Sequence, residues 1–480
     1  MRHDLLARGA VLAATAAIFG GGCAATPPPP SQPAGIGLPV QAAAPGGFDF
    51  SVPVDYFKLD NGLKVVLSRD ATAPTVTVGV YYRIGFRIEP RGRTGFAHLF
   101  EHLMFQGSAN LGKGEFNRLV ESNGGVLNGS TRFDFTNYFE IVPSNTLETI
   151  LWAEADRMKS LAITQENLAN QQDVVKNEVR GNVLNRPYGG FPWLSMPQYA
   201  NSNWFNAHNF YGDLDDIDSA TLDDARDFFD KYYTPSNAVL VIAGDFDPVQ
   251  AREWVGKYFG RLEARPVEPL PDISEPRQEQ ERRVTQVDAL APRPALALAW
   301  HVPPRGTPEG HAFGLIDELL LQGEDSALWR RIVQEKGYAG SISGGINLLG
   351  NSFNYDGPML WTVYLIHDPS VGPDDIIPDI DEVISRLRDA PPDPAALQRA
   401  LTSIRASLYG LAGSSTRFGL VDLLASFALF DDDPGRINRI EEEFRQVTPE
   451  LIQQVAREYL RPGNRTVLAL EPGAAQETRP

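Results

Sequence analysis

Two histidines separated by four positions, with a glutamate between them, are the clearest chemical signal in the sequence. His98, Glu101 and His102 give the pattern H-x-x-E-H inside the stretch GFAHLFEHLMFQG. On a helix, residues i and i+4 lie one turn apart on the same face, so both imidazoles can reach one metal ion. Imidazole and carboxylate are ligands that zinc accepts. The alternative is a pair of unliganded helix histidines, but only 7 histidines occur in the chain, and a glutamate between two of them favours a metal site.

This motif resembles the signature of the inverted-motif zinc peptidases (inverzincins, the pitrilysin/insulinase family), and especially their half-length branch, which includes mitochondrial processing peptidase. In that family a third ligand, a glutamate, follows on another helix. Glu178 lies 76 residues after His102, inside DVVKNEVR, and matches that second motif. The resemblance covers nearly all of residues 48–475, and further matching stretches are FKLDNGLKVVL, GGVLNGSTRFDFTNYFEIVP and FFDKYYTPSNAVLVIAGDF.

The resemblance implies a division of roles among these residues. His98, His102 and Glu178 would hold one Zn²⁺ per chain and leave one coordination position for water. Glu101 would act as the general base on that zinc-bound water and pass the proton to the leaving amine. Many relatives carry another glutamate seven residues before the third ligand, and here that position is Gln171. The expected site therefore keeps its three ligands but has altered surroundings.

The resemblance also implicates two further pairs of residues. Arg331 and Tyr338 resemble an Arg/Tyr pair with which the family holds substrate and stabilises the tetrahedral intermediate from the opposite half of the enzyme. A solvated helix end is the alternative for this pair. Asn128 and Gly129 match the edge strand on which substrate is expected to bind as an added strand, because a small residue lets a peptide backbone approach closely. An ordinary half-buried strand would be compatible with the same residues.

The elements that must position these residues follow from the apolar pattern. Residues 75–83 (TVTVGVYYR) are rich in β-branched and aromatic side chains and predict a strand. Residues 94–105 predict the helix that carries the H-x-x-E-H motif, with Thr94 as its N-cap. Residues 166–184 predict a second helix, which carries Glu178.

The sequence repeats itself once. GHAFGLIDELLLQG (residues 310–323) aligns with GFAHLFEHLMFQG, so that Gly314 and Glu318 replace the two histidines. Near the ends of the two halves, YYTPSNAVLVIAG aligns with YLRPGNRTVLALEPG. Two collinear matches predict two copies of one α/β unit, of which only the first keeps the ligands. Mixed strand and helix signals without strict βαβ alternation favour an α+β fold.

The predicted fold is therefore α+β, with two homologous α/β sandwich domains, each a mostly antiparallel sheet covered by helices. The resemblance implies that together they form a metallopeptidase half-clamshell. Residues 48–262 are the expected N-terminal catalytic domain, the proline-rich and charged residues 263–283 the linker, and residues 284–475 the inactive C-terminal domain. Full-length relatives have four such domains around a chamber. The chain is therefore expected to form a homodimer, or a heterodimer with a related half-length chain.

The single cysteine lies near the N-terminus and indicates export. Residues 11–19 (VLAATAAIF) are too few for a permanent membrane span but suit the core of a signal peptide, here residues 1–22. The small residues before Cys23 resemble a bacterial lipobox, although Gly20 stands where leucine is usual. Cys23 is thus the expected lipidation site, and residues 23–47 are the expected proline-rich tether. The expected location is the periplasm, with a lipid anchor in the outer membrane; an ordinary secretory signal is the alternative.

Composition excludes several functions. A net charge of -18, from 61 acidic and 43 basic residues, argues against nucleic acid as a partner. One cysteine permits neither an intrachain disulfide nor a cysteine-based zinc site. The predicted function is an exported zinc metalloendopeptidase that hydrolyses peptides or unfolded polypeptides. The alternative is a non-catalytic peptide-binding or scaffold subunit of a heterodimeric peptidase complex.

Overall fold

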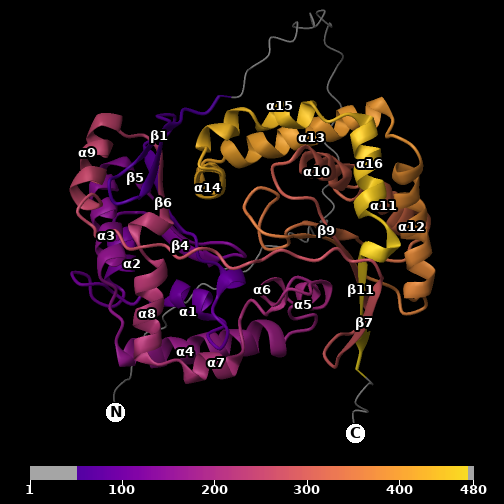
Figure 1. Cartoon of the computed structure of the whole chain (residues 1–480), viewed down its shortest axis with the longest axis horizontal. Helices are drawn as coiled ribbons and strands as arrows, with labels where there is room; N and C mark the ends of the chain where they lie inside the picture. The colour runs from indigo at the N-terminus through magenta and orange to yellow at the C-terminus, as the bar shows by residue number, and fades with distance from the viewer. Residues whose placement is uncertain (1–50, 474–480) are drawn as a thin grey trace, which may run out of the picture. The chain divides into compact units, whose positions relative to one another are not determined.

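Two mixed β-sheets organise residues 51–473, the part of the chain that this computed structural model describes (Figure 1). The expected signal peptide, Cys23 and the tether lie outside these residues. Each sheet is mostly antiparallel and is covered by helices, so the predicted α+β fold is confirmed.

The first sheet has its strands in the order β1-β2-β6-β3-β5-β4. They are β1 (Asp55–Lys58), β2 (Lys64–Arg69), β3 (Thr75–Tyr82), β4 (Val126–Thr131), β5 (Thr136–Pro143) and β6 (Ala238–Gly244). Only β2 and β6 run parallel, and every other neighbouring pair is antiparallel. Among the described strands β4 pairs with β5 alone, so β4 is an edge strand.

The second sheet repeats this order as β7-β11-β8-β10-β9, without a counterpart of β1. Its strands are β7 (Arg282–Asp288), β8 (Ala295–His301), β9 (Ser343–Ile346), β10 (Leu360–Ile366) and β11 (Arg465–Pro472). The parallel pair of β7 and β11 corresponds to that of β2 and β6, and β9 takes the edge position of β4. The shared strand order supports the two copies that the sequence predicts.

The helices of the first half pack on one face of the first sheet (Figure 1). They are α1 (Phe96–Leu103), α2 (Glu115–Ser122), α3 (Leu147–Lys159), α4 (Gln165–Val179), α8 (Leu222–Tyr232) and α9 (Pro248–Tyr258). Alternate residues of β6 serve two cores: Leu240 and Ile242 join the core under these helices, whereas Val239 and Val241 join the core that includes the second half. Because both faces are covered, β6 is a continuous apolar run rather than an alternating one.

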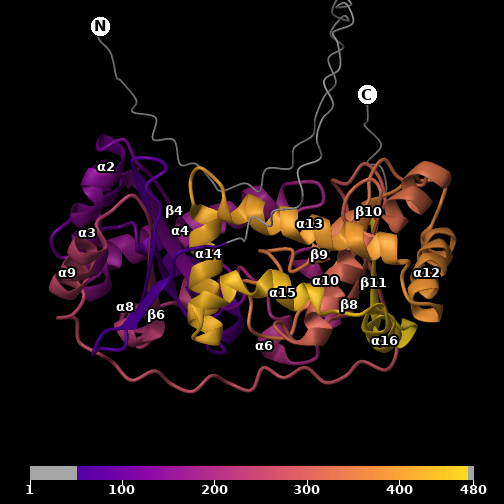
Figure 2. The same cartoon turned by 90° about the horizontal axis from the view of Figure 1, so that it is seen from above.

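The two halves exchange helices. Helix α14 (Phe418–Ser426) belongs to the second half but packs on β3 and β6 of the first sheet, as Figure 2 shows. Gly79 in β3 makes room for it, since a Cβ at this position would lie 2.6 Å from Cγ1 of Val421. In return, α5 (Ser195–Ala200) of the first half packs on β7, β8 and β11 of the second sheet, where β8 presents a row of alanines. The two copies therefore share their cores.

The remaining helices complete the two halves. Those of the first half are α6 (Trp204–Ala207) and α7 (Leu214–Ser219), and those of the second are α10 (Pro308–Leu320), α11 (Ala327–Trp329), α12 (Pro373–Asp389), α13 (Pro394–Ala412), α15 (Ile440–Arg445) and α16 (Pro449–Tyr459). Residues 263–281, most of the predicted linker, contain neither helix nor strand and run along one edge of the two halves (Figure 2). Within residues 51–473, no helix combines the length and apolar character that crossing a bilayer requires.

Candidate metal centre

Helix α1 turns the H-x-x-E-H motif away from the core of the first half. Its buried apolar residues Phe96, Leu99, Phe100 and Leu103 recur at helical spacing and pack in that core. The motif consequently lies beside α4 and the edge strand β4, both of which contact α1. Because α4 carries Glu178, the fold brings the two predicted ligand motifs together.

The start of α1 differs from the prediction. Thr94 does not cap the helix, since its hydroxyl donates to Asp216 (2.6 Å). The N-cap position is Gly95, whose backbone is left-handed (φ 80°). The buried carboxylate of Glu89 takes the capping role and accepts hydrogen bonds from the amides of Gly95 (2.8 Å) and Ala97 (2.6 Å). It satisfies two otherwise unpaired amides at the positive end of the helix dipole.

The three predicted ligands converge on one point. The Nε2 atoms of His98 and His102 lie 3.3 Å apart, and Glu178 reaches His102 Nε2 with Oε2 at 3.3 Å and His98 Nε2 with Oε1 at 3.7 Å. Ligands placed tetrahedrally about 2.0–2.1 Å from a zinc ion lie about 3.3 Å from one another. Both the donor types and their spacing therefore fit zinc. In residues 51–473 this is the one such group of three or more His, Cys, Asp or Glu side chains.

The surroundings shift the pKa values of the three candidate ligands in different directions. Burial lowers the pKa of His98 below its ordinary value. Burial acts in the same direction on His102, but the hydrogen bond with Glu178 and the charge of Glu101 outweigh it, with help from Gln171, so the pKa of His102 is raised. Burial would raise the pKa of Glu178, yet its hydrogen bond with His102 and the nearby imidazoles lower it. The site thus offers a neutral imidazole and an ionised carboxylate, and a metal would displace the proton that His102 favours.

Glu101 lies between α1 and the edge strand β4. The hydroxyl of Thr131, at the end of β4, donates a hydrogen bond of 2.7 Å to Glu101 Oε2. On the same strand Gly129 leaves space for the glutamate stem, because a Cβ at this position would lie 3.3 Å from Glu101 Cγ. The carboxylate is therefore oriented by the strand that the sequence predicts to bind substrate.

The predicted substrate-binding residues lie at the free edge of the first sheet. Asn128 is exposed, and Asn128 and Gly129 pair with Phe139 and Tyr138 of β5 on one side only. The other side of β4 faces no strand among the described residues. An extended peptide can thus hydrogen-bond to β4 directly beside Glu101.

Arg331 and Tyr338 are brought together, but not to the metal ligands of their own chain. Both contact Asp379 of α12: Arg331 Nη2 lies 2.5 Å from Oδ1, and the Tyr338 hydroxyl donates to Oδ2 at 2.7 Å. Figure 1 shows α11 and α12 on the opposite side from α1. This location suits the expectation that the pair faces the site of another subunit, which stays a prediction.

Sequence reasoning missed the aromatic residues around the ligands. The Tyr211 hydroxyl donates to Glu178 Oε1 at 3.3 Å, and the Phe210 ring lies 5.3 Å from the His98 ring. Both residues stand in the loop before α7, more than thirty positions beyond Glu178, and their sequence carries no motif. Only the fold brings them to the site.

In the second copy an aromatic ring crowds the position equivalent to His98. A Cβ added at Gly314, the counterpart of His98, would lie 3.0 Å from the ring of Phe444. Glu318, the counterpart of His102, accepts a hydrogen bond from Ser403. An aromatic ring from α15 therefore fills the space beside the helix that carries the ligands in the first copy.

Two family models match the chain. The model described as "Insulinase (Peptidase family M16)" matches residues 64–188, which contain all three candidate ligands. The model described as "Peptidase M16 inactive domain" matches residues 219–404, which include most of the copy without ligands.

Known proteins resemble the chain over most of its length. Zinc protease PqqE of Helicobacter pylori is 26% identical over 419 residues, which make up 86% of this chain and 92% of that protein. The crystal structure of a protease from Helicobacter pylori matches with a TM-score of 0.80 at 26% identity and covers 88% of this chain and 100% of its own. The periplasmic protease PqqL of Escherichia coli shares the fold, with a TM-score of 0.72 at 16% identity over 90% of this chain and 48% of that one. Several other curated relatives match over half of their own length or less.

The duplicated sheet topology, the converging ligands and the two family models agree on one assignment. The insulinase model matches the half with the three converging side chains, and the inactive-domain model matches most of the half in which Phe444 crowds the equivalent position. A relative that matches most of the chain is named a zinc protease. The chain belongs to the pitrilysin/insulinase-type M16 peptidase family.

Proposed function

We propose that this protein is an exported zinc-dependent endopeptidase that hydrolyses peptides or unfolded polypeptides. The single observation that carries the proposal is the convergence of His98, His102 and Glu178 at 3.3–3.7 Å, next to a glutamate oriented by Thr131. A purely structural site would not need a free carboxylate beside it. The names of the zinc-protease relatives support the same reaction.

The residues of the chain would divide the work. His98, His102 and Glu178 would hold one zinc ion, which when bound polarises water and the substrate carbonyl. Glu101 takes the proton of the attacking water and returns it to the leaving amine, and the Thr131 hydroxyl keeps the carboxylate directed toward the edge of β4. The backbone of Asn128 and Gly129 binds the peptide as an added strand, which gives affinity with little dependence on side chains.

We propose further that the active form is a dimer. The chain spans 48% of PqqL, so two chains together match the length of that protein. In such a dimer Arg331 and Tyr338 of one subunit would face the zinc of the other and stabilise the oxyanion of the tetrahedral intermediate. A homodimer and a heterodimer with a related half-length chain both satisfy this arrangement, and the mass of the purified protein in light scattering distinguishes them from a monomer.

The proposed location is the periplasm, with Cys23 lipidated and inserted in the outer membrane. The apolar stretch and the small residues before Cys23 support it, as does the similarity to PqqL of Escherichia coli, which is a periplasmic protease. Mass spectrometry of the membrane fraction detects the acylated N-terminal peptide. Recovery of a mature chain that lacks Cys23 would contradict lipidation.

A second candidate is a non-catalytic peptide-binding or scaffold subunit. The match of residues 219–404 to an inactive-domain model favours it. Glu101→Gln separates the two functions, because it should keep zinc but abolish cleavage of a mixed peptide library. Glu121→Gln, on the exposed side of the neighbouring α2, is the matched control. Equal cleavage by wild type and Glu101→Gln would refute the proposed mechanism, and a zinc-loaded wild type that cleaves nothing would support the scaffold function.

A further inference from the structure

An apolar pocket lies between the two copies, close to the candidate metal centre. It contains about 370 Å³ of space, part of it open to solvent, and none of its lining residues is charged. The first half supplies one wall with Phe133, Trp193 and Met196, and the second half supplies the other with Leu349 and Met359. Nothing in the proposed reaction uses this pocket.

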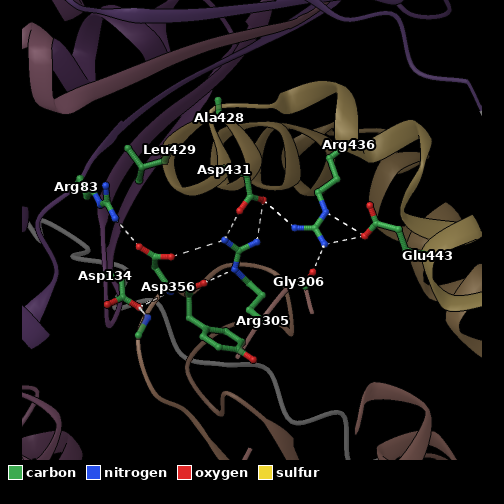
Figure 3. Close-up of polar contacts among 12 residues, drawn as sticks. Arg83, Asp134, Arg305, Gly306, Asp356, Ala428, Leu429, Asp431, Arg436 and Glu443 are labelled. Carbon is green, nitrogen blue, oxygen red and sulfur yellow. Dashed lines mark hydrogen bonds and ion pairs between the residues drawn. The ribbon is translucent and has the colours of Figure 1, made fainter. Parts of the chain in front are cut away.

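The second wall is an extra loop that is fastened to the first copy. Strands β4 and β5 are joined by residues 132–135, whereas their counterparts β9 and β10 are joined by the much longer segment 347–359. Asp134 Oδ2 accepts hydrogen bonds from the amides of Asp356 (2.8 Å) and Gly357 (3.3 Å), and Figure 3 shows Asp134 against this loop.

A buried arginine completes the fastening of this loop. Arg87 Nε donates to Asp134 Oδ1 (2.6 Å), and Arg87 Nη1 donates to the carbonyl of Pro358 (2.9 Å). Gly357 is required here, because a Cβ would lie 2.6 Å from Arg87 Cζ. The loop therefore holds a fixed position, and the pocket it closes is a built feature rather than a gap between mobile segments.

The pocket is one aromatic ring away from the metal ligands. Phe210 lies 5.3 Å from His98 on one side and 5.7 Å from Trp193 on the other, between ring centroids. His98 and Trp193 are therefore no more than about 11 Å apart, the length of roughly three residues of extended chain. Phe133 follows Thr131, the partner of Glu101, by two positions at the end of β4. A peptide paired with β4 beside Glu101 thus runs toward the pocket.

We infer that this pocket binds an apolar side chain of the size of leucine or methionine, within about three residues of the cleaved bond of the peptide, and so sets the sequence preference. The inference rests on the proposed function. Main-chain pairing with β4 is indifferent to sequence, so selectivity must come from side-chain pockets. A charged or very small side chain would lose the apolar contact, and the second copy, which has no ligands of its own, contributes half of the selective surface.

The test compares cleavage and binding of peptides that differ at one position. Wild-type protein should cleave peptides with leucine or methionine there at least tenfold faster in kcat/KM than peptides with glycine or aspartate, the range that apolar pockets reach. Leu349→Trp, which fills the pocket, should remove this preference and leave the glycine peptides unchanged. Leu290→Trp, at an exposed turn outside the pocket, is the control for added bulk. Fluorescence anisotropy in the Glu101→Gln background should show the same preference in Kd without any cleavage.

Three results would overturn the inference. The first is equal cleavage by wild type whatever the residue within four positions of the cleaved bond. The second is an equal loss of kcat/KM for all peptides in Leu349→Trp, and the third is a change of oligomeric mass in Leu349→Trp with the preference intact. The last would make the pocket a subunit contact. If zinc-loaded wild type cleaves no peptide, the proposed function fails, and peptide binding to the same protein still decides whether the pocket selects apolar residues.

Discussion

Replacing Glu89 with glutamine should weaken zinc binding although Glu89 touches no ligand. The carboxylate accepts two hydrogen bonds from the first amides of α1, at 2.6 and 2.8 Å, in a fully buried position. Glutamine keeps one acceptor oxygen and turns an NH₂ group toward the other amide. The loss at the cap is therefore about one hydrogen bond to a charged group, or about 1.5–3 kcal/mol, with a further ~0.5 kcal/mol from the helix dipole. The contact of Glu89 Oε2 with His208 Nε2 (3.5 Å) also loses its charge.

The effect should appear in both folding and metal binding. The metal-free Glu89→Gln protein should lose about 2–3.5 kcal/mol of its free energy of unfolding, measured in urea. Because α1 carries both histidines, zinc affinity measured by competition with a chelator should fall about 10–100-fold, as for other groups that orient ligands. Glu115→Gln is the matched control, since Glu115 also accepts a hydrogen bond from a backbone amide at the start of a helix, that of Gly112 (2.7 Å), but is exposed. It should change stability by less than about 0.5 kcal/mol. Unchanged zinc affinity in Glu89→Gln, together with unchanged urea unfolding, would refute the capping role.

Two further outcomes follow from single contacts. Thr131→Val keeps the shape of the side chain but removes the donor to Glu101, so kcat should fall about tenfold while zinc affinity stays constant; a variant with full kcat would contradict the orienting role. Asp432 accepts hydrogen bonds from Lys58 and Tyr56; slight burial would raise its pKa, but these contacts lower it to about 2. Because the folded pKa lies below the unfolded one, its contribution to stability is present above about pH 4 and is lost as the pH falls toward 2. Asp432→Asn should therefore lower the melting temperature at pH 7, with a difference that shrinks as the pH falls from about 4 toward 2; a constant difference would rule this out.

The candidate metal site was predictable in part because its signal is local. The spacing of His98 and His102 needs only a helix, and a helix follows from the apolar residues around them. The pairing with Glu178 came from the family resemblance, since nothing in the 75 residues between His102 and Glu178 predicts that α4 packs on α1. The N-cap of α1 was predicted wrongly, because Thr94 has the residue type and position of a usual cap. The actual hydrogen-bond acceptor is Glu89, which precedes the helix and reaches its first amides because the chain bends at the left-handed Gly95.

The fold was predictable as two copies but not as two interlocked ones. The duplicated motifs and the shared strand order agree, because each copy repeats its own local pattern. The exchange of α5 and α14 depends on contacts between residues hundreds of positions apart, such as Gly79 with Val421. Such contacts produce no periodic pattern of apolar residues in the sequence. The apolar pocket was missed for the same reason, since its walls come from both halves.

The exchange of α14 has a consequence for the order in which the chain can mature. Strand β6 ends at Gly244, and the helix that covers its second face begins at Phe418. Because a chain emerges from its N-terminus, about 170 further residues must follow β6 before this cover exists. Until then the apolar side chains of Val239 and Val241 have no cover from their own half. The copy that carries the candidate ligands is thus made first but completed late. A chain truncated before α14 would leave the apolar second face of the first sheet exposed, which favours aggregation.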